Sequence, residues 1–236
     1  MRLAKLKLRD FRNIRRLDAA FEPGFHLLLG RNAQGKTNLL EAVYLLATLR
    51  SFRGVGNAHI IRNGQKGFFA GGLALGQAES DIRYFWSAAQ RKLTVNEKPM
   101  RRVADYLGTL RTVVFCTEDA LLVNGPAKSR RRFLDLLLTQ TQPGYLELLH
   151  RYTEALRSRN ALLRRDPADM AMIDSFTREL IANGEKLIAA RHGLVKKLSP
   201  LVRLGYRKIA AKPEDASMAY APSVRDDFAV DLAKSR

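Results

Sequence analysis

The sequence predicts an α/β fold that continues into an antiparallel helical hairpin. Three observations support this fold class. Residues 4–9, 17–22 and 58–98 are rich in alternating apolar and polar positions, a pattern typical of half-buried strands. A glycine-rich loop lies between an apolar run and a helix-spaced apolar pattern within residues 25–47. From residue 149 to residue 201, apolar residues recur at spacings of three and four, as in paired helices.

The first 29 residues are predicted to form a small β-meander. Apolar and basic residues alternate over 4–9, and a second alternating segment covers 17–22. Pro23-Gly24 predicts a turn. The apolar run Phe25–Leu29 then predicts a buried strand that leads into the glycine-rich loop.

The loop from Gly30 to Thr37 fits the phosphate-binding pattern G-x-x-x-x-G-K-[ST]. Gly30 and Gly35 permit backbone angles that a Cβ would forbid, so successive N–H groups can surround an anion. Lys36 is placed to reach the β- and γ-phosphates, and the Thr37 hydroxyl to bind Mg²⁺. The predicted ATP-binding residues of this loop are Gly30, Arg31, Asn32, Ala33, Gln34, Gly35, Lys36 and Thr37.

The context of this loop favours a nucleotide site over the alternative, a glycine-rich surface turn. An apolar strand is predicted before it, and after it Leu39, Leu40, Val43, Leu46 and Ala47 recur at helical spacing. The loop therefore opens a helix whose N-terminal dipole also favours phosphate.

Residues 58–98 are expected to form a second, antiparallel sheet against the layer that carries the loop. A short helix is expected over Val103–Leu110, followed by an apolar strand over Val113–Cys116. Glu118 and Asp119 come after that strand, as the acids of a Walker B motif would. A complete small P-loop NTPase that uses these two acids is therefore one alternative.

The charge balance indicates a polyanionic partner. Lys and Arg total 41 against 23 Asp and Glu, a net charge of +18, which favours nucleic acid; a solvated basic face is the alternative. The single cysteine, Cys116, excludes an internal disulfide and suits a reducing cytoplasm. The N-terminus lacks the apolar core of a signal peptide, and no apolar run is long enough to span a bilayer. We expect a cytoplasmic protein without a membrane partner.

The second half is predicted to be helical. Ser129 is expected to cap a helix whose first turn holds Lys128 and Arg130–Arg132, cations that a phosphate, an acidic neighbour or solvent would have to accommodate. Two further helices follow Pro143-Gly144 and are joined by a turn at Asp166-Pro167, and Lys212-Pro213 ends the second. Basic residues on the outer faces of the two helices are candidates for duplex phosphate contact: Arg151, Arg157, Arg159, Arg164, Arg165, Arg191, Lys196, Lys197, Arg203, Arg207 and Lys208.

Several motifs, taken together, resemble the RecF family of SMC/ABC-type ATPases. They run in order from the first residue to about Leu201. One minor departure is Thr117, where the family pattern usually has proline. The motifs are Arg9-Asp10-Phe11-Arg12-Asn13-Ile14, the P-loop with Asn38–Ala42, Ser51-Phe52-Arg53, Gly125-Pro126 with Arg131–Asp135, and Arg159-Asn160.

The resemblance implies an ABC/SMC-like P-loop ATPase head with a helical arm. It implies a cytoplasmic protein that binds ATP with Mg²⁺, forms an ATP-dependent homodimer and binds single-stranded DNA and gapped or junction duplexes. It also implies a role in replication, recombinational repair and the SOS response, loading a recombinase with RecO and RecR as partners. By the same analogy Arg12 and Asn13 would lie beside the nucleotide, whereas Glu118-Asp119 would not be the Walker B acids. From sequence alone, Arg12 could equally be an exposed loop arginine.

The resemblance also predicts a division of the chain. Residues 1–140 would form the N-terminal part of the head, 141–212 the helical arm and 213–236 a truncated tail. The family's signature, Walker B and D-loop motifs find no counterpart after Pro213. We therefore expect the first two-thirds of a RecF-type protein, which binds nucleotide but hardly turns it over, so enzymatic activity stays open. The alternative is a non-enzymatic basic DNA-binding module with a vestigial P-loop.

Overall fold

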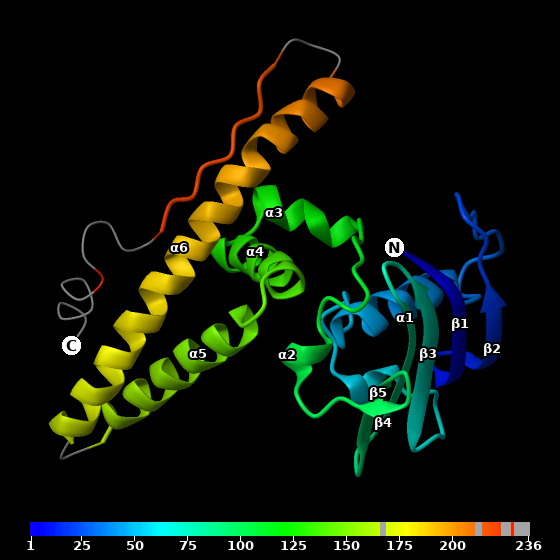
Figure 1. Cartoon of the computed structure of the whole chain (residues 1–236), viewed down its shortest axis with the longest axis horizontal. Coiled ribbons are helices and arrows are strands. Elements are labelled where there is room, and N and C mark those ends of the chain that lie inside the picture. The colour runs from blue at the N-terminus through cyan, green and yellow to red at the C-terminus, as the bar shows by residue number, and fades with distance from the viewer. Residues whose placement is uncertain (166–168, 211–213, 223–227, 229–236) are drawn as a thin grey trace. The chain divides into compact units, whose positions relative to one another are not determined.

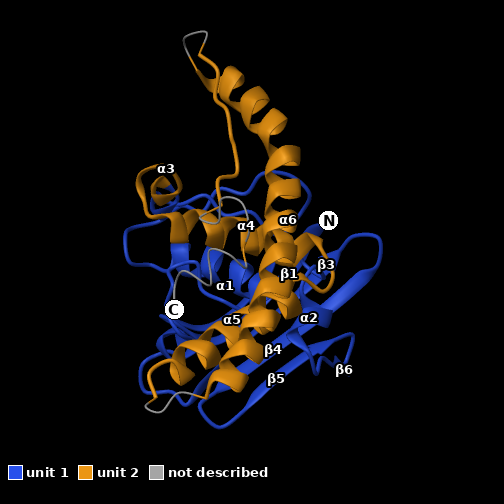
Figure 2. Ribbon diagram, turned by 90° about the vertical axis from the view of Figure 1, so that its left-hand side faces the viewer, with its two compact units in different colours: residues 1–119 blue, residues 120–236 orange. Residues whose placement is uncertain are grey.

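The computed structural model describes residues 1–165, 169–210, 214–222 and 228. The chain divides into two compact units, Met1–Asp119 and Ala120–Arg236 (Figures 1 and 2). The functional division expected at residues 140 and 212 remains a prediction. Much of the expected tail lies outside the described residues.

The first unit is built on one antiparallel sheet in the order β2-β1-β3-β4-β5-β6 (Figure 1). The expectation of two separate sheets was wrong, because β1 pairs with β2 on one side and with β3 on the other. Residues 67–99 therefore extend the N-terminal meander instead of covering it. The strands are β1 (Arg2–Phe11), β2 (Ile14–Ala20), β3 (Gly67–Leu75), β4 (Glu79–Ser87), β5 (Arg91–Val95) and β6 (Lys98–Pro99).

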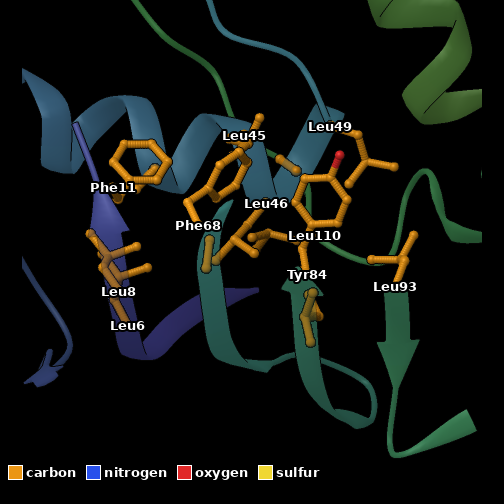
Figure 3. Close-up of a cluster of buried hydrophobic side chains, with 14 of the residues drawn as sticks. Leu6, Leu8, Phe11, Leu45, Leu46, Leu49, Phe68, Tyr84, Leu93 and Leu110 are labelled. Carbon is orange, nitrogen blue, oxygen red and sulfur yellow. The ribbon is translucent and has the colours of Figure 1, made fainter. Parts of the chain in front are cut away.

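Helix α1 (Lys36–Thr48) lies on one face of this sheet and forms the core with it. Leu45 and Leu46 of α1 are fully buried beside Phe68 of β3 and Tyr84 of β4 (Figure 3). The helix expected at 103–110 is present as α2 (Val103–Tyr106), and the Tyr106 hydroxyl donates a hydrogen bond to the Leu46 carbonyl. A 3-10 turn, η1 (Asn57–Ile60), lies between α1 and β3.

Two strands expected from apolar runs are not formed. Residues 25–29 and 113–116 are irregular, and the side chains of Phe25 and Phe115 are 89% and 94% exposed. An apolar run becomes a buried strand only where neighbouring strands satisfy its backbone N–H and C=O groups. Among the described residues, neither segment pairs with a strand of the sheet.

The second unit is helical, as expected. It contains α3 (Leu121–Asn124), α4 (Ala127–Thr141), α5 (Tyr145–Leu162) and α6 (Met170–Ile209), after the 3-10 turn η2 (Thr117–Ala120). Helices α5 and α6 pack side by side as a hairpin (Figure 1). Most of the connecting turn expected at Asp166-Pro167 lies outside the described residues. Ser129 was wrongly expected to cap α4, because that helix begins at Ala127 and its N-cap position is Pro126.

A partly buried ion pair joins α4 to α6. Arg191 Nε and Nη2 donate to the two Asp135 carboxylate oxygens at 2.8 and 3.0 Å, and the Tyr145 hydroxyl donates to Asp135 at 2.5 Å. Arg159 is also buried and donates to Thr177. Arg191 and Arg159 were expected to face solvent on the outer surface of the hairpin. That expectation was wrong for both, since these two guanidinium groups hold the helices of the unit together.

Candidate nucleotide-binding site

The loop Gly30–Thr37 curves into the N-terminus of α1. Gly35 occupies the N-cap position with φ of 98°, and Ala33 has φ of 66°, so the chain turns sharply before the helix starts at Lys36. The first N–H groups of a helix have no partner within it and carry a partial positive charge. The structure therefore places Lys36 and Thr37 in the first turn, where such N–H groups favour an anion.

Lys36 is folded back onto its own loop. Its ammonium donates hydrogen bonds to the carbonyls of Gly30 at 2.5 Å and Arg31 at 2.7 Å. This contact holds the positive charge against the loop that leads into α1. Thr37, the residue after Lys36, is exposed, so a bound cation could reach its hydroxyl.

Asn13 follows β1 and rests against the loop. Its side-chain amide donates to the Ala33 carbonyl at 3.1 Å, and its carbonyl oxygen accepts from Asn38 Nδ2 at 2.8 Å. A Cβ placed on Gly35 would lie 2.8 Å from that oxygen. Asn13 therefore fixes the curvature of the loop, and glycine is required at position 35 by both space and backbone angle.

Arg12 lies one residue away but points into the protein. Its guanidinium holds the carboxylate of Glu41 on α1, with Nε–Oε2 and Nη2–Oε1 distances of 3.0 and 2.7 Å. It also donates to the carbonyl of His59 at 2.8 Å. Hence the structure brings Arg12 and Asn13 together at the P-loop helix. The contact of Arg12 with a phosphate remains a prediction.

The surroundings of Glu41 include residues that the sequence did not identify as part of the site. Glu41 is completely buried, and its Oε1 accepts from the Ser51 hydroxyl at 2.5 Å. Arg53 lies 3.8 Å from Oε2. The helical spacing of α1 indicates that Glu41 needs a partner. Glu41, Leu45 and Thr48 share one helical face at spacings of four and three, so the Glu41 carboxylate lies on the buried face of the helix.

Glu118 and Asp119 do not follow a strand. Asp119 accepts a hydrogen bond from the Cys116 backbone N–H at 2.7 Å, within the turn η2. The pKa of Glu118 is lowered, chiefly by a hydrogen bond from its own backbone N–H. A Walker B acid is presented by the end of a buried strand, and the strand that this alternative requires is not formed.

Within the described ranges, no group of three or more His, Cys, Asp or Glu side chains is arranged to hold a metal ion. Among the described helices, none combines the length and the apolar character that a bilayer-spanning segment requires.

Comparison with known proteins identifies relatives along nearly the whole chain, although no family model matches. The DNA replication and repair protein RecF of Synechococcus sp. (strain JA-2-3B'a(2-13)) is 39% identical over 230 residues, which are 95% of this chain and 60% of the relative. The Symbiobacterium thermophilum protein of the same name is 36% identical over 240 residues, 100% of this chain and 64% of the relative. The Geobacter metallireducens protein is 35% identical over 223 residues, 94% and 60% of the two chains.

Solved structures give the same result. The recombination mediator protein RecF–ATPrS in the RecFOR pathway has a TM-score of 0.83 at 28% identity and covers 89% of this chain and 58% of that one. Its RecF–ATP counterpart also has a TM-score of 0.83, at 28% identity, with 88% and 57% covered. This likeness confirms the predicted fold class. The chain spans 60 to 64% of the length of the curated relatives described above.

Proposed function

Since this chain corresponds to the N-terminal part of RecF proteins, we propose that it binds ATP and DNA and acts in DNA replication and recombinational repair. Its relatives are named for replication and repair, and two similar structures are of RecF with ATP or its analogue. The observation that carries the proposal is the loop Gly30–Thr37, which turns at Gly35 into the N-terminus of α1 and holds the Lys36 ammonium against the Gly30 carbonyl.

The proposed cofactor is ATP with Mg²⁺. Backbone N–H groups of the loop and the Lys36 ammonium would hold the β- and γ-phosphates, and the Thr37 hydroxyl would bind the metal. Asn13 supports the loop from the side through Ala33. When bound, the metal supplies charge neutralisation between the phosphates. The described acids near the loop do not form a Walker B strand, so we propose binding without assigning a catalytic residue.

The test of the nucleotide proposal is a comparison of Lys36→Ala with the unaltered chain. Isothermal titration with MgATP should show clearly weaker binding for Lys36→Ala. Lys98→Ala, which removes an exposed lysine of β6, is the matched control and should bind normally. Thr37→Ala should weaken binding in the presence of Mg²⁺ more than in its absence. Equal MgATP affinity of Lys36→Ala and the unaltered chain would contradict the nucleotide site.

The proposed partners are nucleic acid, other repair proteins and a second copy. The net charge of +18 supports binding to DNA, which we propose to be single-stranded DNA and gapped or junction duplexes. From the RecFOR pathway of the similar structure we further propose RecO- and RecR-type partners, ATP-dependent dimerisation, recombinase loading, the SOS response and a cytoplasmic location.

A salt titration of DNA affinity, with and without ATP, distinguishes this proposal from the alternative. A DNA affinity that falls steeply with salt and also responds to ATP supports a RecF-type function. An equally salt-dependent affinity that is indifferent to ATP supports a basic DNA-binding module with a vestigial P-loop.

A further inference from the structure

The sheet of the first unit has a solvent face opposite α1, and two phenylalanines lie at its middle. Phe69 of β3 and Phe85 of β4 are direct partners in the β-ladder. Their neighbours Phe68 and Tyr84 point to the other face and belong to the core. Phe69 and Phe85 themselves are half-buried and lie outside that core. Alternation along the strands therefore puts both rings on the solvent face.

Glycines leave room for these rings to lie along the sheet. The ideal Cβ position of Gly71 is 2.8 Å from the Phe69 ring, and that of Gly67 is 3.2 Å from the Phe85 ring. Each ring thus covers a position where another residue would project a side chain. A ring held along the sheet leaves its other side open to solvent, which is the arrangement that a stacking partner requires.

Cations lie on both sides of the two rings, in the same row of paired residues. Arg9 pairs with both Arg16 and Phe69, and Lys92 pairs with Phe85, so one row across five strands reads Arg16, Arg9, Phe69, Phe85, Lys92. Lys92 and Arg16 are exposed, and the Arg9 side chain is 39% exposed. A row of two aromatic rings between cations therefore lies on one face of the sheet.

The adjacent row adds Lys7 and Arg83, and Lys5 lies in the row beyond. The acids on this face are Asp18, Asp81 and, towards the β3–β4 and β5–β6 turns, Glu79 and Glu97. Asp81 lies 2.6 Å from Arg83.

Of these four acids, Asp18 lies in the row next to that of Phe69 and Phe85, on the strand β2. It is shared by Lys7, Arg9 and Arg16 at 4.0, 3.5 and 3.7 Å. Three cations to one carboxylate leave that part of the face basic.

We propose that this solvent face of the β2-β1-β3-β4-β5 sheet binds single-stranded nucleic acid. Phe69 and Phe85 would stack with unpaired bases, and Arg9, Arg16 and Lys92 would pair with phosphates. Bases within a duplex are stacked on each other and do not offer their faces, so aromatic rings on this solvent face select a single strand. The inference deepens the proposed function, because it assigns a surface to the DNA binding proposed above.

The test compares single-stranded with duplex binding in the full chain. The probes are a fluorescent 20-mer of thymidylate and a duplex of the same length, measured by anisotropy. Phe69→Leu with Phe85→Leu should weaken single-strand binding by about fivefold or more, because one stacked base contributes roughly 1–3 kcal/mol. Duplex affinity and MgATP affinity should remain within about twofold. Phe25→Leu, which alters an exposed phenylalanine outside the sheet, is the matched control and should leave the single-strand and duplex affinities unchanged.

A salt titration tests the cations. Arg9→Gln with Lys92→Gln should reduce the slope of log affinity against log salt by about 1.4 for the single strand, since each lost phosphate contact contributes about 0.7. Thermal unfolding of each variant shows whether the fold is kept. Ultraviolet crosslinking of the unaltered chain to the oligonucleotide, mapped by mass spectrometry, does not depend on the variants and should label residues 67–75 or 79–87.

The outcomes separate the two proposals. Suppose that the unaltered chain binds the oligonucleotide but the phenylalanine variant binds it equally well, or that crosslinks fall only in residues 120–236. Either result contradicts binding at the sheet face and leaves the proposed DNA binding of the chain intact. If single-strand and duplex affinities fall together, or polyglutamate competes as well as DNA, the face is a general polyanion site and the proposal is overturned. If the unaltered chain binds no DNA at low salt, the DNA part of the proposed function fails as well.

Discussion

Arg12 and Glu41 form a bidentate ion pair that joins the end of β1 to the helix of the P-loop. The Glu41 carboxylate is fully buried, and the Arg12 side chain is only 18% exposed. Arg12 itself adopts φ of 55°, an unusual angle for a residue with a side chain. The pair therefore fixes the chain direction so that the next residue, Asn13, meets the loop.

Arg12→Ala should destabilise the first unit by about 3 kcal/mol, because it leaves the Glu41 carboxylate buried without its main partner. Urea unfolding measures the change in the free energy of unfolding. Arg16→Ala, whose side chain is 72% exposed, is the control and should change it by less than about 0.5 kcal/mol. An equal effect of the two substitutions would show that the ion pair is not structural.

Gly35→Ala should disturb the loop more than an ordinary glycine substitution. The φ of 98° disfavours any side chain, at a cost of about 1–3 kcal/mol, and the new Cβ meets Asn13. Asn13→Ala in the same chain should relieve the steric part, so the double variant should be more stable than the sum of the single changes predicts. Additive changes would indicate that the two residues do not touch.

Leu46→Ala should destabilise the protein more than Phe115→Ala, although leucine has the smaller side chain. Leu46 is fully buried in the core, so its truncation should cost about 2–5 kcal/mol. Phe115 is 94% exposed in this chain, and its truncation should change the free energy of unfolding by less than about 0.5 kcal/mol. Thermal or urea unfolding checks both, and a large loss for Phe115→Ala would show that residues 113–116 are packed.

Tyr145→Phe should destabilise the second unit by about 1 kcal/mol, the typical contribution of one hydrogen bond. The Tyr145 hydroxyl donates to Asp135, and its pKa is raised, first by burial and then by this hydrogen bond. Asp135→Ala should cost more, since it also leaves the partly buried Arg191 guanidinium without its carboxylate. Helicity followed by circular dichroism during urea unfolding gives both values, and equal values would contradict the ion pair.

Asp215 should titrate at unusually low pH. Hydrogen bonds from Arg203 and then Arg207 lower its pKa from 3.8 to about 2. A lowered folded-state pKa means that this contact stabilises fully above pH 3.8 and is lost as the pH falls through about 2. Carboxyl carbon chemical shifts followed by NMR should show the low midpoint. Arg203→Gln should move it towards 3.8, and an unmoved midpoint would exclude the pair as the cause.

Local chemistry explains which elements could be predicted. The P-loop pattern, the turn at its glycines and the apolar stripes of α5 and α6 depend on residues close in sequence. Residues 25–29 and 113–116 were predicted wrongly because an apolar run becomes a strand only beside other strands. Arg191 and Arg159 look like surface residues in a helical pattern. Only the tertiary structure shows that they contact other helices, Arg191 through Asp135 of α4 and Arg159 through Thr177 of α6.

By itself, the sequence determined the P-loop pattern, the paired helices and the basic character, because each follows from residue type and short-range spacing. The tertiary structure decided that residues 67–99 extend the first sheet, that Arg12 holds Glu41, and that Phe69 and Phe85 share a face with Arg9 and Lys92. Strand pairing and side-chain burial join residues distant along the chain, and a local pattern does not specify which of the possible partners meet.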